Sequence, residues 1–143
     1  MTELTLAKAN AIIEAALAKA AELNFKPLCV VVLDAGGHLV ASQRQDGASF
    51  LRPEIASGKA FGALAIGAGG RTVTKHAIER PHFMQGLSGV SGGKIVPVPG
   101  GVLIRAEANG SIIGAVGISG DTSDNDEATA IAGIEAAGFA AEA

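Results

Sequence analysis

The chain has 143 residues, a formal net charge of −3 and a hydrophobic fraction of 48%, which is enough apolar material for one domain spanning residues 1–143. Its charged fraction of 17% is too low for a disordered chain. Lysine and arginine form no run and there is no Trp or Tyr, so we expect no nucleic-acid partner. No apolar run approaches the roughly 18 residues of a membrane span, and the N-terminus lacks a secretion-signal pattern. We therefore expect no membrane partner and a cytoplasmic location.

The first half of the chain predicts a helix, a two-stranded hairpin and two further helices. In chain order these elements are residues 5–24, 28–34, 38–45, 52–67 and 72–80. The first strand is a continuous apolar run and the second alternates, and two glycines supply the tight turn between them. Pro53 suits the first turn of the helix predicted at 52–67. The residues of that helix expected to face inward are Ile55, Phe61, Leu64 and Ala65.

The second half predicts a loop, three strands and a helix. In chain order these are residues 83–93, 94–98, 102–107, 111–119 and 124–141. The glycine- and serine-rich loop is long enough for a lid over a site. Two prolines mark the first of the strands as an edge strand, Asn109-Gly110 is typical of a hairpin turn, and Ser123 suits the N-cap of the last helix. The order α-ββ-αα-βββ-α predicts an α/β (α+β) fold with a five-stranded, mainly antiparallel sheet and helices packed on it.

Three glycines at every third position, Gly114, Gly117 and Gly120, lie on the last long strand. Glycine in a strand often marks the close approach of a ligand or of another backbone. These residues are therefore candidates for the floor of a ligand-binding pocket, and tight helix–sheet packing is the alternative. Their spacing is not that of a dinucleotide-binding fingerprint.

Four charged residues are candidates for catalysis: Arg44, Asp46, Lys59 and Glu127. Arg44 and Lys59 suit the clamping of a carboxylate. Asp46 or Glu127 can move a proton if burial raises the pKa of its carboxyl group. We expect the four side chains to converge on one cavity that the loop at 83–93 covers.

The histidines and the single cysteine give weaker signals. His76 and His82 are candidate cofactor-binding residues, but on a helix their spacing would not bring them to one metal ion, and we predict no metal site. Cys29 lies in an apolar run and is expected to be a small buried hydrophobe.

Three segments, residues 31–40, residues 44–48 with Lys59 downstream, and residues 113–121, together resemble the GlcG/HbpS-like family of haem-binding proteins. The resemblance implies a profilin-like α/β/α sandwich, a homo-oligomer, and haem or another tetrapyrrole as ligand. In haem-binding members of that family a proposed iron ligand is a histidine in or near the first helix, and residues 5–24 contain none.

Three functions stay open at the level of the sequence. The leading one is a small-ligand-binding protein of this family, with haem or another tetrapyrrole as the small-molecule ligand. The alternatives are a small catabolic enzyme (an isomerase, lyase or hydrolase) acting on an organic acid, and a structural subunit of a homo-oligomer. The missing haem ligand favours the enzyme, whereas the lack of a recognisable catalytic constellation favours the binding protein.

Overall fold

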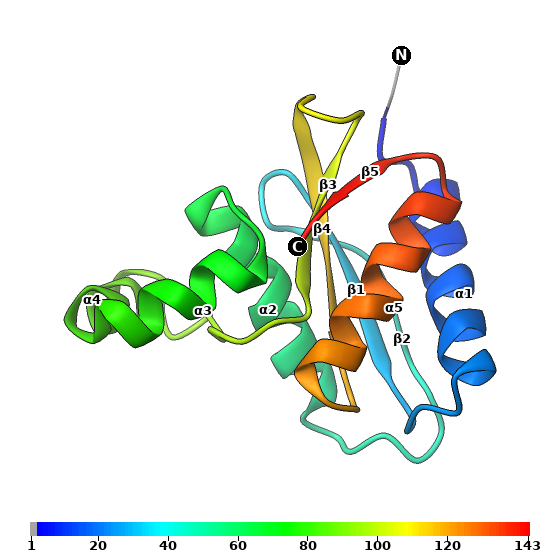
Figure 1. Ribbon diagram of the computed structural model, residues 1–143, viewed down its shortest axis with the longest axis horizontal. Helices are drawn as coiled ribbons and strands as arrows, with labels where there is room; N and C mark the ends of the chain where they lie inside the picture. The colour runs from blue at the N-terminus through cyan, green and yellow to red at the C-terminus, as the bar shows by residue number, and fades with distance from the viewer. Residues whose placement is uncertain (1–2) are drawn as a thin grey trace.

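The computed structural model describes residues 3–143 as one sheet with helices on both of its faces (Figure 1). The elements are α1 (Leu6–Glu22), β1 (Cys29–Asp34), β2 (Leu39–Arg44), α2 (Arg52–Ile66), α3 (Gly70–Glu79), α4 (Pro81–Val90), β3 (Gly101–Arg105), β4 (Ile112–Ser119), α5 (Ser123–Ala136) and β5 (Ala140–Glu142). The strand order is β2-β1-β4-β3-β5, and each neighbouring pair is antiparallel. This confirms an α+β fold with a five-stranded antiparallel sheet.

One face of the sheet is covered by α1 and α5, which pack against each other (Figure 1). Ile12 and Ile13 of α1 and Ile134 of α5 are fully buried against strand residues. Gly133 makes the close approach possible, because a Cβ on it would lie 2.6 Å from the carbonyl oxygen of Ile12. The alanine- and glycine-rich composition of α5 thus allows two helices to share one face of a small sheet.

The other face is covered by α2, which presents its small residues to the sheet. The buried alanines are Ala56, Ala60 and Ala63. Gly101 and Gly117 are cross-strand partners directly beneath the helix, and a Cβ on either would overlap backbone atoms of α2. The helix backbone therefore lies directly on the sheet.

The expectation that Ile55, Phe61, Leu64 and Ala65 face inward was confirmed only for Phe61 and Leu64, which pack against the buried cluster beneath α2. Ala65 is exposed, and the three larger side chains are only partly buried. Large side chains would hold the helix away from the glycine-lined strands, so the small-residue side faces the sheet and the bulky residues occupy the flanks. This rotation of α2 decides which side chains are left to line a cleft.

A helical arm, formed by α3 and α4 (residues 70–90), projects beyond α2 (Figure 1). The prediction of a loop at 83–93 was wrong, because most of this segment belongs to α4. Met84 and Leu87 pack into an apolar cluster with Val73 of α3, whereas Gly86 and Gly89 face open space. Apolar residues at helical spacing therefore outweighed the low helix propensity of glycine.

The fifth strand is also not the predicted one. Residues 94–98 form no strand; they run along α2, where the Val96 amide donates to the Gly58 carbonyl oxygen at 3.1 Å. The fifth strand is β5, which pairs with β3. The last helix was predicted to reach residue 141, but it ends at Ala136, two residues before Gly138 with its φ of 88°. Its N-cap is Thr122 rather than Ser123. No helix within residues 3–143 is long and apolar enough to cross a membrane.

Candidate functional site

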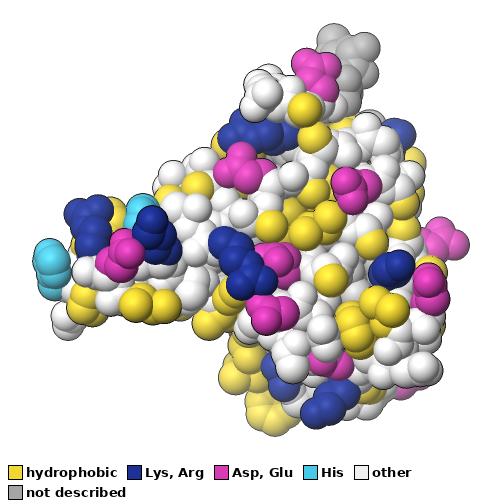
Figure 2. Space-filling view, in the orientation of Figure 1, with side chains coloured by type: hydrophobic (Ala, Val, Ile, Leu, Met, Phe, Trp, Pro, Cys, Tyr) yellow, Lys and Arg dark blue, Asp and Glu magenta, His cyan; other side chains and the backbone are white. Residues whose placement is uncertain are grey.

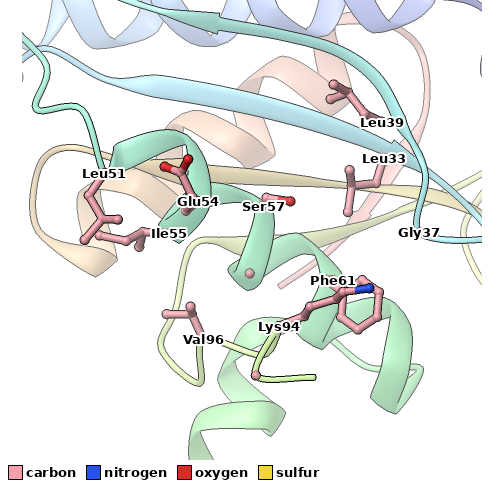
Figure 3. A pocket seen from close by; sticks show the side chains of 12 residues that line it. Leu33, Gly37, Leu39, Leu51, Glu54, Ile55, Ser57, Phe61, Lys94 and Val96 are labelled. Atoms are coloured by element: carbon pink, nitrogen blue, oxygen red, sulfur yellow. The ribbon is translucent and has the colours of Figure 1, made fainter. Parts of the chain in front are cut away.

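A cleft of about 620 Å³ opens between α2, the β1–β2 hairpin and the segment that follows α4 (Figure 3). Its twelve lining residues are mostly apolar or glycine, with three polar exceptions. They are Leu33, Gly37, Leu39, Leu51, Glu54, Ile55, Ser57, Gly58, Phe61, Gly93, Lys94 and Val96. A cleft of this size with an apolar lining and few polar groups is typical of small-molecule sites.

The orientation of α2 determines which of its side chains line this cleft. Because the alanine side of the helix faces the sheet, Ile55, Ser57 and Phe61 are left to line the cleft. Gly37, at a φ of 82°, brings the hairpin turn against the Phe61 ring, where an added Cβ would lie 3.2 Å from Cε2. The hairpin and the helix therefore meet at this end of the cleft.

Charge in the cleft is confined to Glu54 and Lys94. Within residues 3–143 neither side chain forms an ion pair. The Lys94 Nζ atom lies 5.6 Å from the centroid of the Phe61 ring. Figure 3 places Lys94 beside Phe61, with Leu51 at the opposite end. The cleft thus offers an apolar wall, with a cation at one end that no side chain of the described residues neutralises.

The rim of the cleft exposes large apolar side chains. Leu39 is 63% exposed and Leu51 is 53% exposed, and the neighbouring Phe50 is 85% exposed. Exposed apolar side chains beside an apolar cleft extend the surface on which a ligand larger than the cleft can rest.

The four predicted catalytic side chains do not converge. Arg44 and Asp46 line a separate cavity of about 540 Å³ between the end of α1 and the end of β2. Lys59 is buried, and Glu127 pairs with Arg71 at an Oε2–Nε distance of 2.9 Å. The expected shared cavity was therefore wrong, and the segment expected to cover it is part of the helical arm.

The three glycines of β4 and its end make packing contacts. A Cβ on Gly114 would meet the Leu33 carbonyl oxygen, and one on Gly117 would meet α2. Gly120 has a φ of 154° and lies against Pro27. Their assignment to a ligand site stays a prediction, and none of the three lines the cleft.

The histidines lie outside the cleft. His76 and His82 belong to the helical arm, where Figure 2 shows histidine and basic side chains together. The His76 ring contacts Phe83 edge-on at a centroid distance of 6.0 Å, and its buried Nδ1 has no hydrogen-bond partner within residues 3–143. Their role as cofactor-binding residues stays a prediction.

His38 lies in the hairpin turn and lines a different cavity with Asp34. The backbone amides of His38 and Gly36 donate to Asp34 Oδ1, and these hydrogen bonds lower the pKa of the Asp34 carboxyl. Among residues 3–143 no group of three or more His, Cys, Asp or Glu side chains is placed to hold a metal ion.

Sequence reasoning missed the residues that give the cleft its polar character, Glu54, Ser57 and Lys94. Two signals were present in the sequence. The apolar pair Phe50-Leu51 stands directly before a helix, where a polar cap is more usual, and Lys94 directly follows two glycines. Neither signal identifies a cleft until the orientation of α2 is known.

Comparison with known proteins gives the family. Residues 4–135 match the family described as haem degrading protein HbpS-like. An uncharacterized 15.0 kDa protein of the dhaT–dhaS intergenic region of Citrobacter freundii is 35% identical over 123 residues, covering 86% of this chain and 84% of that protein. The corrinoid adenosyltransferase PduO of the same organism is 30% identical over 92% of this chain, which spans only 39% of PduO.

Solved structures agree with this match. A crystal structure of a complex of PduOC with heme superposes with a TM-score of 0.84 at 26% identity, covering 99% of each chain. The crystal structure of HbpS superposes with a TM-score of 0.80 at 28% identity, covering 94% of this chain and 90% of that one. The protein therefore belongs to the HbpS-like family of haem-degrading proteins.

Proposed function

We propose that the protein binds a small, largely apolar ligand in the cleft beside α2, and that a tetrapyrrole such as haem is the ligand to test first. The observation that carries this proposal is the cleft itself, which combines a volume of about 620 Å³, a mostly apolar lining and a lysine ammonium that forms no ion pair within residues 3–143. An apolar macrocycle with carboxylate side chains matches these features.

Family membership supports the choice of ligand. The structural relative PduOC was crystallised with heme, at 26% sequence identity. Fold and family alone are weak evidence for a shared ligand, so the proposal depends on the cleft and not on the likeness. The enzyme alternative is less well supported, since its four candidate side chains lie in three separate places.

A cavity-filling variant tests the proposal. Ser57 lines the cleft, so the phenyl ring of Ser57→Phe would occupy the space that the ligand needs. We expect hemin, titrated into the full chain and followed by its Soret absorbance, to bind the native protein and to bind Ser57→Phe at least about tenfold more weakly.

Ala65→Phe is the matched control, because Ala65 is exposed on the same helix and does not line the cleft. This variant is expected to bind hemin like the native protein. Equal weakening in both variants, or none in either, would place the hemin site elsewhere and contradict the proposal. Thermal unfolding of both variants verifies that they are folded.

A further inference from the structure

Haem is the ligand that the family's description implies, and the cleft suits the organic part of haem better than its iron. The apolar macrocycle has matching surface in Leu39, Ile55 and Phe61, and its carboxylates have the Lys94 ammonium. The iron has no equivalent partner. Proteins hold haem iron with the side chains of His, Cys, Met or Tyr, and none of the twelve lining residues is of these types.

The two ionisable side chains of the cleft do not replace such a ligand. A lysine ammonium has three donor hydrogens and no free electron pair for a metal. The Glu54 carboxylate is a hard oxygen donor of the kind that suits magnesium, calcium or manganese. The cleft therefore has a group for the anion of a ligand but no customary ligand for haem iron.

The remaining soft or nitrogen donors of the described chain lie elsewhere. His38 is next to two lining residues in sequence, but its side chain belongs to the cavity on the other side of the hairpin. His76 and His82 are on the helical arm. Cys29 is 1% exposed, and Met84 belongs to α4, where it packs with Val73 of α3.

From this mismatch we infer that the cleft recognises the flat apolar body and the carboxylate of its ligand and not a bound metal ion. The ligand class is a largely apolar organic anion, for which a metal-free porphyrin is as good a member as haem. The inference rests on the proposed function, because it concerns the same cleft, and it adds that iron contributes nothing to recognition there.

The test compares hemin with protoporphyrin IX, which has the same macrocycle and carboxylates but no iron. Binding of protoporphyrin IX to the full chain is measured by fluorescence anisotropy, and hemin is measured by competition against it and by Soret absorbance. We expect the two dissociation constants to agree within about threefold. Replacing His38, His76 and His82 together by alanine should leave the hemin affinity and spectrum unchanged.

The role of Lys94 is tested with both ligands. Lys94→Gln removes the positive charge and should weaken hemin and protoporphyrin IX equally, by about threefold to tenfold. Lys75→Gln is the matched control, because Lys75 is an exposed lysine on the helical arm that does not line the cleft. It should leave both affinities unchanged.

The outcomes distinguish failure of the inference from failure of the proposed function. Hemin binding more than about tenfold tighter than protoporphyrin IX would overturn the inference, and the proposed function would stand if Ser57→Phe still weakens hemin binding. Binding of neither porphyrin would refute the proposed tetrapyrrole function and the inference with it. Equal binding that Lys94→Gln does not weaken would overturn the assignment of the carboxylate to Lys94.

Discussion

Lys59 of α2 pairs with Asp126 of α5 at an Nζ–Oδ2 distance of 3.0 Å, although the two helices lie on opposite faces of the sheet (Figure 1). The lysine passes the sheet beside Gly100, where a Cβ would lie 2.9 Å from both Cδ and Nζ of Lys59. Nζ also donates to the Ile118 carbonyl oxygen at 2.9 Å, and the Asp121 amide donates to Asp126 Oδ1. Both side chains are buried, so this pair connects the two helical layers past the start of β3.

Removing one member of this pair is expected to destabilise the fold strongly. Lys59→Met leaves the Asp126 carboxylate buried without its cation, which costs about 3–5 kcal/mol of unfolding free energy. Urea unfolding followed by circular dichroism measures the loss.

Two further variants distinguish the effect of the uncompensated Asp126 charge from the effect of losing a lysine side chain. Adding Asp126→Asn to Lys59→Met removes the uncompensated charge and keeps an oxygen for the Asp121 amide, so part of the stability should return. Lys75→Met, at an exposed lysine, should change little. A loss of less than about 1 kcal/mol in Lys59→Met would contradict the importance of the pair.

Gly117 and Gly86 are expected to respond to alanine in opposite directions. Gly117→Ala forces a methyl group into the backbone of α2, and overpacking of this kind costs about 1–3 kcal/mol or more. Gly86 faces open space within α4, so Gly86→Ala should stabilise by about 0.5–1 kcal/mol through helix propensity. Thermal unfolding of the two variants measures both changes. A neutral Gly117→Ala would mean that α2 can move off the sheet without cost.

The elements with clear periodicity were predictable from the sequence, whereas those decided by distant contacts were not. The first helix, the hairpin and β4 came out within a few residues of their observed bounds. β5 is only three residues long and has no alternating pattern, because its pairing with β3 alone makes it a strand. In α4 the glycines suggested a loop, and only the apolar contacts beneath them explain the helix.

The candidate site was less predictable than the fold. Charged residues attracted attention because their chemistry is visible in the sequence, yet Lys59 and Glu127 have partners that lie far away along the chain. The cleft depends on which side of α2 faces the sheet, and Gly101 and Gly117 decide that from two other elements. A single sequence does not reveal such a long-range steric choice.

We expect the protein to form a homo-oligomer through apolar surface that includes the helical arm. Ile78 is 76% exposed and Val90 is 86% exposed on that arm. Size-exclusion chromatography with light scattering at micromolar concentration should show more than one chain per particle, and Ile78→Asp combined with Val90→Asp should shift the particle toward the monomer. Ala108→Asp, at an exposed turn, is the control. A native protein that is monomeric at this concentration would refute the expectation.

The Cys29 thiol is expected to be unreactive in the folded chain and to make stability depend on pH above about 9. Burial raises its pKa from 9.0 to about 11; Arg44 lowers it in part and Glu54 raises it further. Iodoacetamide should therefore modify Cys29 slowly in native protein and rapidly after unfolding in guanidinium.

The sign of the pH effect follows from the direction of this shift. The unfolded thiol ionises first, so the contribution of the neutral folded thiol is complete below about pH 9 and is lost as the pH rises toward 11. Lysines also titrate in that range, so the measurement is the difference in unfolding free energy between the native chain and Cys29→Ala, which retains the lysines. This difference should shift steadily against the native chain from pH 9 to pH 11. A difference that stays constant across the window would mean that the folded thiol ionises as easily as the unfolded one.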